Sequence, residues 1–143
     1  MSHDMPSISA RLRQAGFRVT PQRQLILDAV CKLGGHVTPE AVYTQVRSIT
    51  PAINRATVYR TLHFLTEQQI LAEMALPNGR TGYEIASETP HHHLVCRQCG
   101  GTVEIADGLI RPLAAEIETQ YDFTLDMRHI SFLGLCAECR AEK

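Results

Sequence analysis

The 143-residue sequence has no tryptophan and few other aromatic residues, so any hydrophobic core consists mainly of Leu, Ile, Val and Ala. No apolar run approaches the roughly 20 residues that span a bilayer, and the first ten residues lack the features of a secretory signal. The apolar fraction of 44% excludes an intrinsically disordered chain. We therefore expect a soluble, cytoplasmic, globular protein with no membrane partner.

Charge is close to balanced over the whole chain but uneven along it. Residues 1–86 contain nine Lys and Arg against six Asp and Glu, a balance of +3. Residues 87–143 contain five Lys and Arg against nine Asp and Glu, a balance of -4. The two values sum to the net charge of -1 for the whole chain. A basic half joined to an acidic half indicates that only the first meets a polyanion.

Helix start signals recur in the first half. Thr20-Pro21 and Thr38-Pro39 each combine an N-cap residue with a proline in the first turn, and Asn54 can cap a further helix. Apolar residues at helical spacing follow each cap, and Gly34-Gly35 ends the first of these helices. The side chains that we expect to be buried are Leu25, Ile26, Ala29, Val30, Leu33, Val42, Tyr43, Val46, Ile49, Val58, Leu62 and Leu65.

A hairpin pattern follows the last of these helices. Residues 70–76 and 81–85 read as strands, and the Asn78-Gly79 pair between them is a strong turn signal. Helices followed by a hairpin are the order of a winged helix-turn-helix. We assign this DNA-binding fold to residues 1–86.

Residues 87–143 predict a small α/β domain, so the fold class is α+β. Short strands are expected at Leu94-Val95 and Val103–Ile105, and a helix at 108–121 with Pro112 near its first turn. Apolar and polar residues alternate over 123–135 as in a strand. The apolar residues stand at odd positions before Arg128-His129 and at even positions directly after it, and a β-bulge would explain this change of parity.

Five cysteines in a protein of the reducing cytoplasm indicate metal or reactive thiols rather than disulfides. Cys96-x-x-Cys99 and Cys136-x-x-Cys139 each place two thiols on a tight turn, and two such turns form the tetrahedral sulfur set of a closed structural zinc site. A domain of about 55 residues has a thin core, and zinc can supply the missing folding free energy. Cys31 lies on an apolar helix face and is assigned to the core.

Several motifs resemble the ferric uptake regulator (Fur) superfamily, in that family's order. They are Val19-Thr20-Pro21-Gln22-Arg23, Ala56-Thr57-Val58-Tyr59-Arg60-Thr61-Leu62, His91-His92-His93-Leu94-Val95-Cys96-x-x-Cys99-Gly100 and Cys136-x-x-Cys139. The resemblance covers about Arg11 to Cys139. It implies a winged helix, a hinge, an α/β dimerisation domain and metal-dependent repression by a homodimer bound to double-stranded operator DNA.

The resemblance also assigns the DNA-reading surface. The helix from Asn54 to Leu65 looks like the family's recognition helix, which enters the major groove. Arg can bind phosphate or guanine there, and Tyr and Thr can contact the thymine methyl group. By resemblance, Tyr59 is the base-contacting residue, and Arg60 and Arg23 hold phosphates. The complete set of implied DNA-binding residues is Arg18, Arg23, Arg55, Thr57, Tyr59 and Arg60.

A second metal site is implied at positions matching the family's regulatory site, which are His36, Glu84, His91, His93 and Glu104. The chain has seven histidines, three of them consecutive. Because alternate side chains of a strand share a face, His91 and His93 can bind one metal while His92 points away. Ligands from both halves would fix the hinge when the metal binds, and so couple metal to DNA.

Three imidazoles and two carboxylates suit Fe(II), Mn(II), Co(II) or Zn(II). Zinc-uptake regulators of the family usually place a cysteine in this site, whereas residues 71–92 contain none. Peroxide sensors typically carry aspartate where Glu104 stands. Both departures favour an iron-type regulator over its zinc-uptake and peroxide-sensing relatives. A further metal site that some family members contain looks incomplete, because Arg111 and Arg128 stand where Glu and His ligands would be expected. His129 is adjacent to that position, but only a shifted strand register would bring it to His92.

Three other function classes compete with this interpretation. A His/Glu site with an open position could activate water in a metal-dependent hydrolase, although the sequence shows no general base or substrate pocket, and we expect no enzyme and no small-molecule substrate. The paired cysteines could form a thiol–disulfide oxidoreductase, which stable zinc would exclude. A purely architectural DNA-binding protein would bind DNA independently of the regulatory metal.

Overall fold

The computed structural model describes residues 5–87 and 89–142. The chain forms two compact units: one comprises residues up to Glu73 with Thr81–Ala86, and the other comprises Met74–Arg80 and residues from Ser87 onward. The division predicted from sequence lies after residue 86, whereas the tip of the hairpin belongs to the second unit. Within the described ranges, no helix has the length and apolar character needed to cross a membrane.

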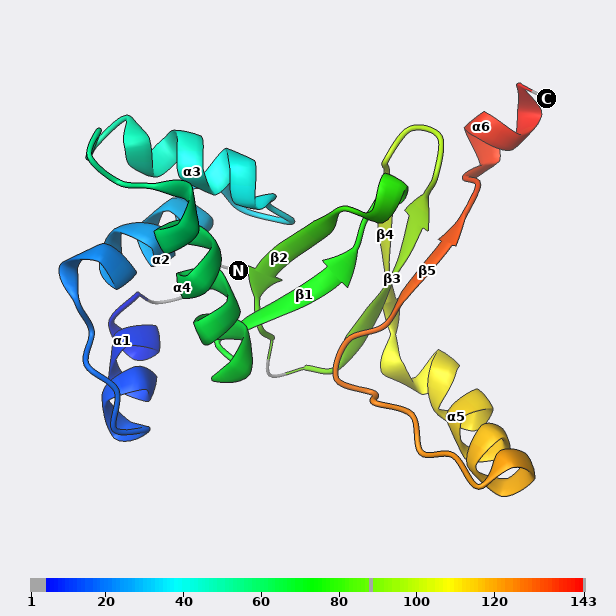
Figure 1. The fold of residues 1–143 in the computed structure, drawn as a ribbon. Coiled ribbons are helices and arrows are strands. Elements are labelled where there is room, and N and C mark those ends of the chain that lie inside the picture. Colours follow the sequence, from blue (N-terminus) through cyan, green and yellow to red (C-terminus); the bar gives the residue numbers. More distant parts are fainter. Residues whose placement is uncertain (1–4, 88, 143) are drawn as a thin grey trace. The chain divides into compact units, whose positions relative to one another are not determined.

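The first unit consists of helices followed by the base of a hairpin, whose tip belongs to the second unit (Figure 1). Its helices are α1 (Met5–Gln14), α2 (Pro21–Leu33), α3 (Pro39–Arg47) and α4 (Arg55–Glu67). The predicted caps are confirmed, because the side chains of Thr20, Thr38 and Asn54 accept hydrogen bonds from backbone N–H groups of the first turns of α2, α3 and α4. Gly34 ends α2 with a φ of 67°.

Sixteen buried hydrophobic residues form one core in the first unit. Val58, Leu62 and Leu65 of α4 are fully enclosed, as the helical spacing predicts. Two predicted core residues are exposed instead: Leu33 lies on the last turn of α2, and Ile49 lies beyond the end of α3. Leu27, which the predicted stripe omitted, is buried. The opposite face of α4 therefore stays available to a ligand.

The hairpin is confirmed. Strands β1 (Leu71–Ala75) and β2 (Thr81–Ile85) pair, and the short 3-10 turn η1 (Pro77–Gly79) joins them. Asn78 and Gly79 have φ values of 65° and 71°, the left-handed conformations that these two residue types adopt most easily. An isolated antiparallel bridge between Val37 and Tyr83 attaches β2 to the segment before α3.

The second unit contains a three-stranded sheet in the order β4-β3-β5 (Figure 1). Strand β3 (His91–Cys96) is central, pairing antiparallel with β4 (Thr102–Ala106) and parallel with β5 (Ser131–Gly134). Helix α5 (Asp107–Tyr121) follows β4 directly, and helix α6 (Ala137–Ala141) ends the described chain. Sequence analysis did not predict α6.

The predicted strand over residues 123–135 is only partly correct. Residues 122–130 have no regular structure, and the strand begins at Ser131. The side chain of Asp126 instead accepts hydrogen bonds from the backbone and guanidinium of Arg128, which replace strand pairing locally. The change of apolar parity near Arg128-His129 therefore marks the start of the strand rather than a bulge within it. Pro112 lies in the second turn of α5, one turn later than predicted.

Asn54 provides a test of how α4 is fixed. Its Oδ1 accepts hydrogen bonds from the backbone N–H of Thr57 at 2.8 Å and from the Thr57 hydroxyl at 3.0 Å. Replacing Asn54 by Ala removes both and should lower the free energy of unfolding of the first unit by about 1 kcal/mol, measured by urea denaturation followed by circular dichroism. Asn54→Asp retains the acceptor and should stay near the parent. Equal losses in both variants would show that the cap does not stabilise α4.

Candidate metal centres and nucleic-acid interface

The four paired cysteines converge in the second unit. Their sulfur atoms all lie within 4.8 Å of one another, and the Sγ atoms of Cys99 and Cys136 are 3.9 Å apart. Sulfurs of a tetrahedral zinc site with bonds of about 2.3 Å are separated by about 3.8 Å, so the spacing matches that ion. Cys96 ends β3, and Cys136 caps α6 through the N–H of Cys139.

The electrostatics of this cluster also fit a cation. Backbone N–H groups, first that of Cys99 and then that of Cys136, point at the Cys96 sulfur and lower its pKa to about 6. A hydrogen bond with the Cys136 sulfur, together with burial, raises the pKa of the Cys139 thiol to about 12. One cysteine is thus prepared for ionisation, while ionisation of the full set requires a positive charge among the sulfurs.

The histidine triplet lies on β3 and follows the predicted alternation. His91 and His93 share one face, with ring centroids 5.0 Å apart. His91 Nδ1 is 3.1 Å from the carbonyl oxygen of Thr89. Because a carbonyl only accepts, the proton of His91 lies on Nδ1, and Nε2 is the unprotonated ring nitrogen of the kind that binds metals.

A third imidazole, which the sequence analysis did not place in this group, joins His91 and His93. His129 precedes β5, and its Nε2 lies 2.9 Å from His93 Nε2. Its ring centroid is 5.3 Å from that of His91. Candidate ligand atoms of the three rings lie within 4.8 Å of one another. Sequence analysis considered His129 only as a partner of His92, and the change of apolar parity beside it was the signal of an irregularity at this position.

His92 occupies the other face of β3 and is completely buried. The N–H of Ile130 donates to His92 Nδ1 at 3.2 Å, so the proton of His92 lies on Nε2 and is donated to Asp107 Oδ1 at 3.1 Å. Burial opposes ionisation of Asp107, but hydrogen bonds from His92 and Arg111 outweigh it and hold its pKa below the usual value. His129 turns toward His93 and not toward His92.

Two more of the predicted ligands meet in the first unit. His36 Nε2 and Glu84 Oε2 are 2.9 Å apart, and both side chains are largely shielded from solvent. The cause is the bridge between Val37 and Tyr83, since residues adjacent to an antiparallel bridge lie opposite each other. This pair is a nitrogen and an oxygen donor held together across 48 positions of sequence.

Glu104 occupies a different environment. It is directly opposite His93 in the β3–β4 register, and its side chain is exposed. Among the described residues, the group formed by His91, His93 and His129 does not include its carboxylate. The second unit therefore presents an all-imidazole group with one carboxylate at its edge.

The six predicted DNA-binding residues all lie in the first unit. Arg55, Tyr59 and Arg60 are exposed on α4, and Tyr59 as a whole residue is 43% accessible. The guanidinium of Arg55 lies 4.5 Å from the centre of the Tyr43 ring, which stacks it against α3. Thr57 is half-buried and bonded to the cap residue Asn54. An exposed, basic and aromatic helix face results.

Two other contacts shape this face. The Tyr59 hydroxyl donates to Glu40 Oε1 at 2.7 Å, and this hydrogen bond raises the pKa of Tyr59. Arg23 lies over the Phe64 ring at 4.0 Å and donates to the carbonyl oxygen of Arg18 at 2.7 Å. Arg18 itself is exposed. The ring of Tyr59 is thus oriented by a carboxylate that sequence analysis did not identify.

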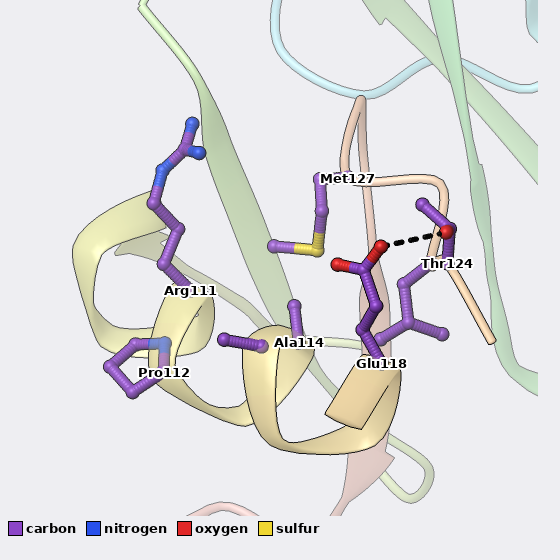
Figure 2. A pocket seen from close by; sticks show the side chains of 8 residues that line it. Arg111, Pro112, Ala114, Glu118, Thr124 and Met127 are labelled. Carbon is purple, nitrogen blue, oxygen red and sulfur yellow. Dashed lines mark hydrogen bonds between the residues drawn. The ribbon is translucent and has the colours of Figure 1, made fainter. Parts of the chain in front are cut away.

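A hollow of about 450 Å³ lies in the second unit, between α5 and the segment that precedes β5. Figure 2 shows the side chains that line it. Apart from Arg111 and Glu118, its lining is uncharged, and the Thr124 hydroxyl donates to Glu118 at 3.1 Å. The hollow contains none of the candidate metal ligands. Helix α5 also carries the exposed apolar side chains of Leu109 and Leu113.

Comparison with known proteins agrees with these features. The model of the Ferric uptake regulator family matches residues 14–133. The ferric uptake regulation protein of Bacillus subtilis is 31% identical over 147 aligned positions that cover 100% of this chain and 99% of that protein. The ferric uptake regulation protein of Campylobacter jejuni is also 31% identical to this chain. The alignment covers 92% of this chain and 85% of the Campylobacter jejuni protein.

Solved structures show the same architecture. The Helicobacter pylori ferric uptake regulator Fur, described as having three functional metal-binding sites, superposes with a TM-score of 0.77 at 26% identity, covering 97% of this chain and 95% of that one. The similarity includes the winged-helix half and the α/β half. The chain belongs to the Ferric uptake regulator family, a family of metal-responsive transcription regulators rather than enzymes.

Proposed function

We propose that this protein is a repressor that binds operator DNA as a homodimer when a divalent metal fills its regulatory site. The observation that carries the proposal is the division of the candidate ligands. His36 and Glu84 form a pair in the first unit, and His91 and His93 form a group in the second. The DNA-reading helix α4 belongs to the first unit, so a metal that joins the two ligand groups would govern its placement.

The two kinds of metal site have separate tasks in this proposal. Cys96, Cys99, Cys136 and Cys139 hold a structural Zn(II), which stabilises the second unit. The regulatory ion is held by His36, Glu84, His91, His93 and Glu104, which come from both units. Bound there, the ion supplies the attraction that favours the closed arrangement of residues 1–86 and 87–143 over open ones. Coupling of about 1–3 kcal/mol is typical of such linkage, and it acts equally on metal and DNA affinity.

Iron(II) is the regulatory metal that we favour in the cell, with Zn(II) or Mn(II) as alternatives. Cysteine is absent from residues 71–92, which argues against a zinc-uptake regulator. Glutamate at 104 argues against a peroxide-sensing relative. Control of metal uptake genes follows from an iron-type assignment. The cytoplasm is the corresponding location, since it holds DNA and keeps the thiols reduced.

The DNA surface follows from α4 and its neighbours. Tyr59 is positioned to contact base edges, because its exposed ring is oriented by Glu40. Arg55 and Arg60 extend from the same helix, and Arg18 and Arg23 lie before and within α2, where they can reach phosphates. Thr57, half-buried beside Asn54, contacts the groove through its methyl group.

Homodimerisation accounts for the exposed apolar surface of the second unit. Ten large hydrophobic side chains are exposed among the described residues, and seven of them are in this unit, although it has the smaller core. They are Leu94, Val103, Leu109, Leu113, Tyr121, Phe123 and Leu133. A patch of this kind on a small domain is typical of an interface with a partner. A two-fold dimer presents two α4 helices to a two-fold operator.

The two metal sites are distinguished by one titration. With a duplex selected from a random-sequence pool by the metal-loaded protein, His91→Ala should leave a folded dimer with one zinc per chain whose DNA affinity no longer responds to Fe(II), Mn(II) or Zn(II). Cys96→Ser should lose zinc and lower the stability or dimerisation of the protein. DNA binding is measured by fluorescence anisotropy under anaerobic conditions, and zinc by elemental analysis.

Identical behaviour of the two variants would contradict separate structural and regulatory sites. DNA affinity that is high and independent of metal in the parent protein would contradict the switch itself, and would favour an architectural DNA-binding protein.

Tyr59 and Arg60 should affect DNA binding in different ways. Tyr59→Ala should weaken binding to the selected duplex by roughly 5- to 150-fold and change random duplex binding little, because it removes a base contact. Arg60→Ala should weaken binding to both duplexes and reduce the slope of log affinity against log salt by about one. His63→Ala is the matched control, since His63 is an exposed residue of α4 paired with Glu67. A control that weakens binding as much as Tyr59→Ala would argue against this reading face.

The dimer surface can be tested by placing a charge on it. Leu113→Asp introduces a carboxylate on exposed α5 and should raise the dimer dissociation constant at least about tenfold, equivalent to about 1.4 kcal/mol, in sedimentation equilibrium. Leu33→Asp makes the same change at an exposed leucine of the first unit and should leave the dimer intact. A monomeric parent protein, or equal effects of both changes, would place the interface elsewhere.

A further inference from the structure

We infer that His129 is a ligand of the regulatory metal, so that the second unit binds this ion through His91, His93 and His129. The inference deepens the proposed regulatory site and rests on it for its biological role. The ligand positions implied by the family resemblance did not include His129.

The first argument is the spacing of the nitrogens. His93 Nε2 and His129 Nε2 are 2.9 Å apart. Two adjacent ligands of an octahedral ion with metal–nitrogen bonds of about 2.1 Å are separated by about 3.0 Å. The two nitrogens therefore already have the separation that one ion requires, and replacing the shared hydrogen by a metal ion demands only small ring movements.

The second argument is that the backbone holds His129 in place. The carbonyl oxygen of Ile130 accepts from the N–H of His93 at 2.9 Å, and the N–H of Ile130 donates to His92 Nδ1 at 3.2 Å. His92 is in turn fixed by Asp107, which pairs with Arg111. Both bonds attach the residue next to His129 to strand β3. The third imidazole is thus preorganised by the same strand that carries the other two.

The third argument concerns Glu104. Its exposed side chain shares a face with His93 but is not part of the three-histidine group. His91, by contrast, contributes a ring nitrogen to that group, and its Nδ1 lies 3.1 Å from the carbonyl oxygen of Thr89. A set richer in imidazole favours ions of borderline softness, such as Co(II), Ni(II) and Zn(II), over Mn(II), which prefers carboxylate ligands.

Cobalt(II) is the probe for the test, used with full-length protein whose four cysteines are loaded with zinc. Competition against a chelator gives the Co(II) dissociation constant. His129→Ala should weaken Co(II) binding at least about tenfold, because it removes one of three imidazole ligands. His63→Ala, at an exposed histidine of the first unit, is the matched control and should have no effect.

A spectroscopic variant separates ligation from a structural role. His129→Cys should generate a sulfur-to-cobalt charge-transfer band in the near ultraviolet when Co(II) is added, while the parent and His63→Cys should not. Zinc content and circular dichroism establish that each variant is folded. The band cannot arise from residue 129 unless its sulfur binds the added ion.

The outcomes distinguish two failures. If His91→Ala abolishes Co(II) binding but His129→Ala leaves it within threefold of the parent, and His129→Cys gives no band, the inference about His129 is overturned and the regulatory site stands. If His91→Ala also leaves Co(II) binding unchanged, the regulatory site of the proposed function is itself wrong.

Discussion

The central strand β3 is the constraint on which the metal chemistry of this protein depends. It is paired on both edges, antiparallel with β4 and parallel with β5, so its register is fixed along its whole length. Because side chains of a strand alternate, that register places His91 and His93 on one face and His92 on the other, and it ends at Cys96. A slip of one residue would exchange the metal-facing and buried histidines. Both candidate metal centres therefore include residues of this one strand.

Features set by local chemistry could be predicted from the sequence. The three capped helices, the Asn78-Gly79 turn and the paired cysteines each depend on residues close together in the chain, and each is present in the structure. The errors concern helix ends and exposure: Leu33 and Ile49 fit the helical period but lie where the core has ended. The short helix that carries Cys139 has too few residues to show a period.

Features that depend on distant pairing could not be predicted. His36 meets Glu84 because Val37 bridges to Tyr83, and no local pattern specifies that bridge. His129 meets His93 because the strand begins at Ser131, later than the alternation suggested. Sequence analysis did not single out Asp107, yet this buried carboxylate accepts a hydrogen bond from His92, which in turn holds Ile130 beside His129. Family resemblance implied that His36 and Glu84 share a site, but it specified neither the bridge that joins them nor the contacts of His129 and Asp107.

The two units differ greatly in how much apolar surface they enclose. The first has sixteen buried hydrophobic residues in one cluster, whereas from residue 89 to 142 the buried apolar residues are Val95 and Ile110, together with the thiols of Cys96 and Cys139. Chelation of zinc should therefore melt one half of the molecule and leave the other folded. Heating such a sample would give two transitions rather than one, and a single melting temperature would not describe this protein. Loss of metal in the cell would then expose one half to proteolysis while the winged helix remained intact.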